Sequence, residues 1–173
     1  MPVERIWVRC PNWVGDMVMA MPLLSALREG FPRALITLGG KPHLKQIPEG
    51  SPWFDEWIDL AGPFWQAVGA LRRGRFDLAL VLPRSFRTAL EAKLGDIPER
   101  IGFSDQGRGF LLTKRLEPAR EPDGSLTPVY NADAYLKLAA AAGCQAANRR
   151  IRLFETPEGI ARAEAILKDL PRP

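Results

Sequence analysis

Apolar and polar positions along the chain follow two alternating periods, which predicts strands interleaved with helices. Short apolar runs predict strands at residues 6–9, 35–38, 57–60 and 78–82, with shorter candidates at 100–102, 111–116 and 151–154. Apolar stripes at helical spacing predict helices at residues 16–30, 64–73, 85–94, 132–142 and 158–170. This alternation predicts an α/β fold with a doubly wound, parallel sheet of the Rossmann-like kind.

Two details of the first helix follow from its residue types. Gly30, Phe31 and Pro32 end it. Pro22 lies inside it and removes one backbone hydrogen bond. Either the helix is kinked at Pro22 or its regular part begins there.

Composition limits the class of protein. The chain has 173 residues, of which 46% are hydrophobic and 25% charged, as in a globular domain with its own core. Its apolar runs fall short of the roughly 18–20 residues that span a bilayer, and the amino terminus lacks the pattern of a signal peptide. We therefore expect a cytoplasmic protein. The net charge of +4 suits an anionic partner, whether a phosphorylated sugar, a membrane or a nucleic acid.

Cysteine and histidine content argues against disulfide and zinc chemistry. Cys10 and Cys144 are expected to be buried, reduced thiols. His43, the only histidine, is expected at the surface or in a turn, and ligand spacing for zinc is absent. We predict no metal and no cofactor.

The segment at residues 11–22 connects the first strand to the first helix and carries the most informative polar residue, Asp16. One interpretation is an N-cap, a position that aspartate favours. The other is a general base in an open cleft at the carboxyl edge of the sheet. Gly15 would let a substrate approach the backbone, and Asn12 and Trp13 would contact it. Trp13 could stack on a sugar ring or pack beneath the loop.

Three further groups of residues could bind anions or membranes. Ser85 is a candidate N-cap of the helix predicted at residues 85–94. Arg84 and Arg87, on either side of it, could present two guanidiniums to phosphates. Lys41 follows two glycines, as in a fragment of a phosphate loop, but the full loop pattern is absent and a tight turn is the favoured interpretation. The helix at residues 64–73 combines aromatics with arginines, which suits an anionic membrane surface or a solvated basic face.

The segment at residues 11–22 closely resembles the ADP-heptose:lipopolysaccharide heptosyltransferases, in particular their heptosyltransferase II branch. Residues 82–89, 97–103 and 108–112 are similar to other segments of that family. Arg84 stands where the family usually has asparagine, and Thr113 replaces another common asparagine.

The resemblance implies that residues 1–173 form the N-terminal, acceptor-binding domain of a two-domain GT-B glycosyltransferase. Asp16 would be the catalytic base of an inverting transfer from ADP-heptose to the lipopolysaccharide inner core. The donor would bind mainly to a C-terminal domain that this sequence lacks, so the chain alone would be inactive. The substrate-binding residues expected on this side are Asn12, Trp13, Gly15, Lys41, Arg84, Ser85 and Arg87. The resemblance also implies a cytoplasmic location, with peripheral contact to the inner face of the inner membrane.

Two other functions fit the same sequence. A non-catalytic module could bind oligosaccharide or a partner protein through the same cleft. A nucleic-acid binder would rest on the basic pI of about 9.4 alone and lacks a recognised module, so we expect no nucleic acid.

Overall fold

A computed structural model describes residues 3–123, 125, 127, 129–145 and 149–168 of the chain. Its centre is a parallel six-stranded sheet with the order β3-β2-β1-β4-β5-β6. The strands are β1 (Arg5–Arg9), β2 (Leu35–Gly40), β3 (Glu56–Asp59), β4 (Leu78–Val81), β5 (Glu99–Phe103) and β6 (Lys114–Leu116). This is the Rossmann strand order, and the predicted fold class is confirmed.

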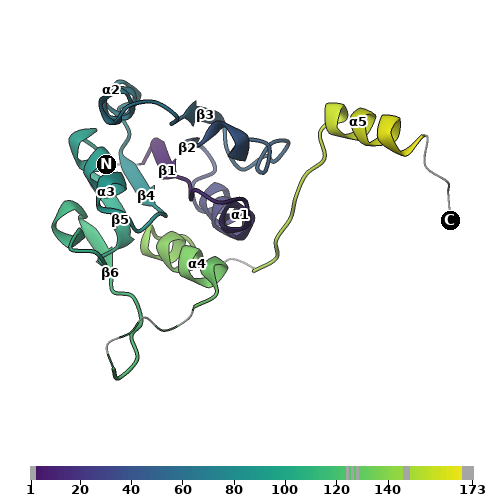
Figure 1. Ribbon diagram of the computed structural model, residues 1–173. Coiled ribbons are helices and arrows are strands. Elements are labelled where there is room, and N and C mark those ends of the chain that lie inside the picture. Colours follow the sequence, from purple (N-terminus) through teal and green to yellow (C-terminus); the bar gives the residue numbers. More distant parts are fainter. Residues whose placement is uncertain (1–2, 124, 126, 128, 146–148, 169–173) are drawn as a thin grey trace.

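Helices cover both faces of the sheet (Figure 1). The helices are α1 (Val14–Gly30), α2 (Phe64–Gly74), α3 (Phe86–Leu94), α4 (Asn131–Ala141) and α5 (Pro157–Leu167), with short 3-10 turns at Pro42–Leu44 and Gly109–Leu111. Side chains alternate across β1: Ile6 and Val8 enter the core beneath α1 and α4, whereas Trp7 enters the core beneath α2 and α3. Burial on both faces explains the continuous apolar run of β4.

The structure corrects the predicted start of the first helix and excludes one of the two alternatives at Pro22. It begins at Val14, two residues before Asp16, and the Met17 N–H donates to the Trp13 carbonyl at 2.9 Å. Asp16 is therefore the third residue of α1 and not its N-cap. The helix also runs continuously through Pro22, so its regular part does not begin there.

The segment at residues 151–154 is not a strand, which corrects the prediction. It runs away from the sheet, and the Phe154 ring packs edge-on against Trp53 with centroids 5.0 Å apart. The predicted strand at 111–116 is likewise shorter, because Gly109–Leu111 forms a 3-10 turn and β6 begins at Lys114. Beyond residue 154, α5 projects from the body and contains no buried residue (Figure 1). The last predicted helical positions, 169 and 170, lie outside the described residues.

Gly39 and Gly40 belong to β2 and do not form a phosphate loop or a turn that ends the strand. A Cβ on Gly39 would lie 1.7 Å from the Trp7 indole, and one on Gly40 would lie 3.0 Å from Trp57. The two glycines therefore make room for tryptophan rings. Among the described residues, none of the helices has the length and apolarity needed to cross a bilayer.

Candidate functional site

A cleft of about 320 Å³ opens at the carboxyl edge of the sheet, between the loops that follow β1 and β4. The chain crosses from β1 to β2 in one direction and reaches β4 on the opposite side, so the cleft lies at the topological switch point. Its lining is mixed: Pro11, Asn12, Trp13, Asp16, Leu82, Pro83, Arg84, Phe103, Asn131, Ala134 and Tyr135. Open parallel sheets bind ligands at this position.

Asp16 lies in this cleft, half-buried, in the first turn of α1. Its Oδ1 accepts a hydrogen bond from Asn131 Nδ2 at 2.8 Å. Among the described residues, no hydrogen bond or ion pair involves the other carboxylate oxygen, Oδ2, so this oxygen is available to a ligand. The carboxylate is thus held in place and still accessible, as a general base requires.

Tyr135 forms part of the wall behind Asp16. Burial raises the pKa of its hydroxyl, the nearby Asp16 charge raises that pKa further, and Arg84 partly opposes both. The phenol therefore stays protonated at neutral pH, and the cleft combines one carboxylate and one guanidinium with neutral polar groups.

Arg84 enters the cleft from the loop after β4. Its guanidinium lies 4.9 Å from the Phe103 ring centroid, and Nη1 is 3.2 Å from Asp105 Oδ2. Its side chain is 32% exposed, so an anion in the cleft can reach it. Asp105 is buried, and its Oδ1 has no hydrogen-bond partner among the described groups.

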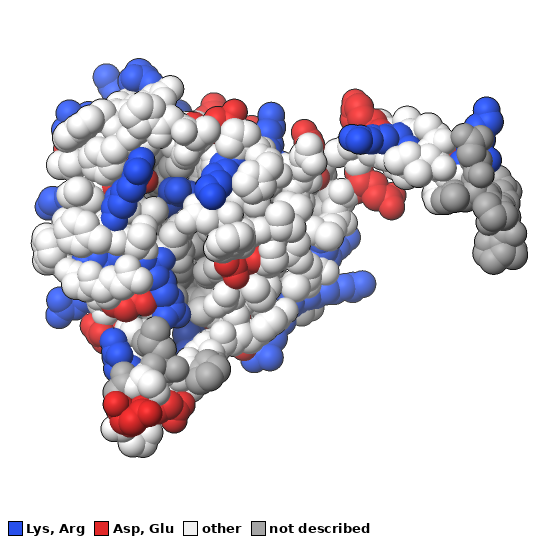
Figure 2. Space-filling model, in the orientation of Figure 1, with Lys and Arg blue, Asp and Glu red and all other residues white. Residues whose placement is uncertain are grey.

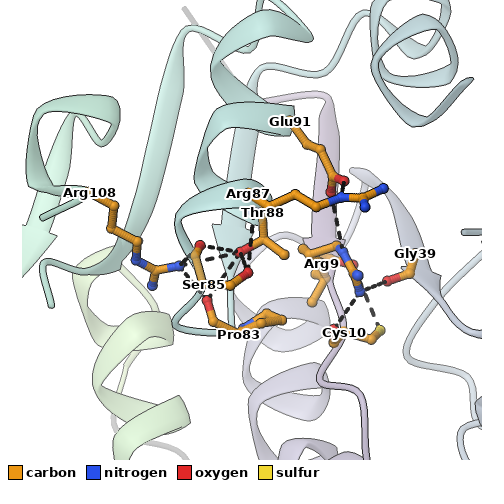
Figure 3. Close-up of polar contacts among 10 residues, drawn as sticks. Arg9, Cys10, Gly39, Pro83, Ser85, Arg87, Thr88, Glu91 and Arg108 are labelled. Carbon is orange, nitrogen blue, oxygen red and sulfur yellow. Dashed lines mark hydrogen bonds and ion pairs between the residues drawn. The ribbon is translucent and has the colours of Figure 1, made fainter. Parts of the chain in front are cut away.

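Arg108 fixes this loop from behind and is fully buried (Figure 3). Its Nε donates to the Phe103 carbonyl at 2.8 Å, and its Nη1 donates to the carbonyls of Ser85, at 3.0 Å, and Pro83. Burial lowers the pKa of this guanidinium to about 10, against the charge of Asp105, so it remains a cation at neutral pH. It holds the backbone that carries Arg84.

The two predicted arginines do not act as a pair. Arg87 turns away from the cleft, binds Glu91 at 2.9 Å and lies over the Phe64 ring. Glu91 is buried and also lies 3.7 Å from Arg9 Nε (Figure 3). Arg87 therefore belongs to a cluster on the α2 and α3 side of the sheet.

The other predicted residues are divided between the cleft and its surroundings. Trp13 is 75% exposed on the cleft rim, which excludes packing beneath the loop. Ser85 is the N-cap of α3, as predicted, and accepts from the Thr88 N–H. Lys41 follows β2 and Gly15 is exposed in α1; both lie outside the cleft lining.

Two curated proteins are similar in sequence to part of this chain. Lipopolysaccharide heptosyltransferase 2 of Salmonella typhimurium is 32% identical over 116 residues, which cover 62% of this chain and 33% of that protein. Lipooligosaccharide heptosyltransferase 2 of Haemophilus ducreyi has the same identity and coverage. No family model matches the chain.

Solved structures agree over nearly the whole chain. Escherichia coli ADP-heptose lps heptosyltransferase II superimposes with a TM-score of 0.74 and 25% identity, covering 97% of this chain and 51% of that one. A glycosyl transferase family 9 structure from Veillonella parvula gives a TM-score of 0.77 at 23% identity and covers 50% of that chain.

This chain is similar to heptosyltransferases in sequence over 116 residues and in fold over nearly its whole length. Its sheet and helices form a Rossmann-like unit of the GT-B fold, and it spans about half the length of the solved structures. The aligned part covers about one third of the curated relatives.

Asn131, Tyr135, Phe103 and Arg108 were not identified from the sequence as site residues. Asn131 and Tyr135 belong to α4, more than 110 positions from Asp16, and only the packing of α1 against α4 brings them together. Helical spacing of Asn131 and Tyr135 was the one signal that could have placed them on a common face. Among the described residues, His, Cys, Asp and Glu do not gather into a group of three or more that could hold a metal.

Proposed function

We propose that this chain is the acceptor-binding half of an inverting glycosyltransferase that moves heptose from ADP-heptose to the lipopolysaccharide inner core. The observation that carries the proposal is Asp16: an accessible carboxylate, held by Asn131, in the cleft at the switch point of the sheet. The relatives' names supply the donor and acceptor classes.

In the proposed reaction, Asp16 Oδ2 accepts the proton of an acceptor hydroxyl. The oxygen of the acceptor hydroxyl then forms a bond to the anomeric carbon of heptose, as the bond from that carbon to the ADP oxygen breaks. The electron pair leaves with ADP, and displacement from the opposite face inverts the configuration. Exposed Trp13 would stack on a sugar ring, and Arg84 would bind an acidic or phosphorylated group of the inner core.

The nucleotide half of the donor is assigned to a second domain outside this sequence, so we expect residues 1–173 to be inactive alone. Asn12, Trp13 and Arg84 line the cleft and are proposed to bind the acceptor. The cleft lining does not include Lys41, Gly15, Ser85 or Arg87, and we propose no direct acceptor contact for them.

Acceptor binding is tested by titrating the isotopically labelled chain with a phosphorylated inner-core oligosaccharide. We expect shifts at the Trp13 indole N–H and the Asn131 side-chain amide, with loss of binding in Arg84→Ala. An Arg87→Ala variant is the matched control, since its guanidinium pairs outside the cleft. Shifts confined to another face, or the absence of any shift at low salt, would contradict acceptor binding in this cleft.

We also propose peripheral contact with the cytoplasmic face of an anionic membrane through α2. Trp65 is 70% exposed, and Arg72 and Arg73 follow it by two helical turns on the outer side. On the face that Figure 2 shows, basic side chains lie in separate groups, which does not favour nucleic acid. Sedimentation with phosphatidylglycerol vesicles tests this: Trp65→Ala should reduce binding, and equal binding would refute it.

A further inference from the structure

The hydrogen bond between Asn131 and Asp16 joins residues 115 positions apart in the chain. Asp16 lies in the first turn of α1, and Asn131 is the first residue of α4. These two helices pack together on one face of the sheet (Figure 1). Both residues line the same cleft, so the contact lies within the candidate site and not beneath it.

The chemistry of this contact selects one carboxylate oxygen. An asparagine amide is a neutral donor, so it fixes Oδ1 without cancelling the negative charge of Asp16. Its 2.8 Å length is typical of a hydrogen bond to an ionised acceptor. With Oδ1 occupied, Oδ2 is the oxygen left for a proton from a ligand.

Helix α4 presents a second neutral group to the same carboxylate. Tyr135 follows Asn131 by four residues and therefore lies on the same side of the helix. Its hydroxyl is protonated at neutral pH, since burial and the Asp16 charge both raise its pKa. Arg84, the cationic residue of the cleft lining, is paired with Asp105.

We propose that Asn131 is a positioning residue that orients Asp16 so that Oδ2 faces the acceptor hydroxyl. This inference rests on the proposed function of Asp16. It assigns to α4 a part in the reaction: this helix orients the Asp16 carboxylate, whereas the loop after β4 binds the acceptor.

The test measures kcat and KM in the complete polypeptide that carries residues 1–173. Asn131→Ala should lower kcat by roughly tenfold to a hundredfold, the range for losing a hydrogen bond to a charged group. The acceptor KM should change by less than about threefold in the same variant, because the lost interaction is with Asp16 and not with substrate. In an Asp16→Asn background, Asn131→Ala should add no further loss, since its effect passes through the Asp16 carboxylate.

Two variants separate positioning from a structural role. Asp133→Ala removes another polar contact of the same helical turn, the 2.7 Å ion pair with Arg149, and should leave kcat within about twofold. Asn131→Asp keeps the size of the side chain and suits a helix N-terminus, but it sets an oxygen against Asp16 Oδ1. It should therefore fold and lose at least as much activity as Asn131→Ala.

The results distinguish this inference from the function on which it rests. Wild-type kcat in Asn131→Asp, or an undiminished effect of Asn131→Ala in the Asp16→Asn background, would overturn the positioning role alone if Asp16→Asn itself shows a large but measurable loss of activity. Near-normal activity of Asp16→Asn would overturn the proposed function, and the positioning role with it.

Discussion

Replacing Arg108 with methionine should destabilise the fold more than any exposed arginine substitution. The guanidinium is fully buried and donates to the carbonyls of Phe103, Ser85 and Pro83. Hydrogen bonds to a charged group contribute about 1.5–3 kcal/mol each, and the cost of burying the charge offsets several kcal/mol of their sum. The net loss on removing one partner of such a network is about 3–5 kcal/mol.

Urea unfolding followed by circular dichroism measures this loss directly. Arg115→Met is the matched control: its side chain is 64% exposed and that of its partner Glu117 is 74% exposed, and an exposed pair of this kind contributes about 0.2–1 kcal/mol. A loss below about 1 kcal/mol in Arg108→Met, or one equal to the control, would refute the role of Arg108 in holding the loop after β4.

Three further outcomes follow from the fold. Burial raises the pKa of the Cys10 thiol from 9.0 to about 12. Between pH 9 and pH 12 the unfolded chain therefore releases this proton while the folded chain keeps it, so the free energy of unfolding should fall as pH rises through this range. The fall should be less steep in Cys10→Ala. Gly39→Val should prevent folding or lower the free energy of unfolding by about 3 kcal/mol in chemical denaturation, because its Cβ would overlap the Trp7 indole. Gly15→Ala is the control: its Cβ meets nothing within 4 Å, so the free energy of unfolding should stay the same or rise. Trp13→Ala should weaken acceptor binding by roughly two- to tenfold in calorimetry without lowering the midpoint of thermal unfolding, since the ring is 75% exposed; unchanged affinity would exclude stacking.

The sheet was predictable because its strands and helices carry strong local patterns. The all-apolar run of β4 forms a strand and the apolar stripe of α1 forms a helix, as predicted, because both are buried against the rest of the core. The segment at 151–154 has the same apolar character, but its Phe154 packs by its side chain on Trp53 and joins no strand edge. A short apolar run becomes a strand only if a neighbouring backbone is available, and the sequence does not encode this locally.

The site was predictable only in part, for a related reason. Asp16 and Trp13 follow a strand end, and the carboxyl edge of a parallel sheet is where ligands bind. The start of α1 was misplaced because aspartate is a strong cap signal, whereas Val14 and Gly15 are weak helix formers. Asn131 depends on the packing of α4 against α1, which no local pattern reveals.

Heptose transfer by Asp16→Asn tests the central claim most directly. The complete polypeptide carrying residues 1–173 would be assayed with ADP-heptose and inner-core acceptor, and ADP release and product formation would be followed together. Loss of a general base predicts a fall in kcat of roughly 10²–10⁴-fold with the fold intact. Activity within a few-fold of the parent enzyme would contradict the assignment of Asp16 as the base.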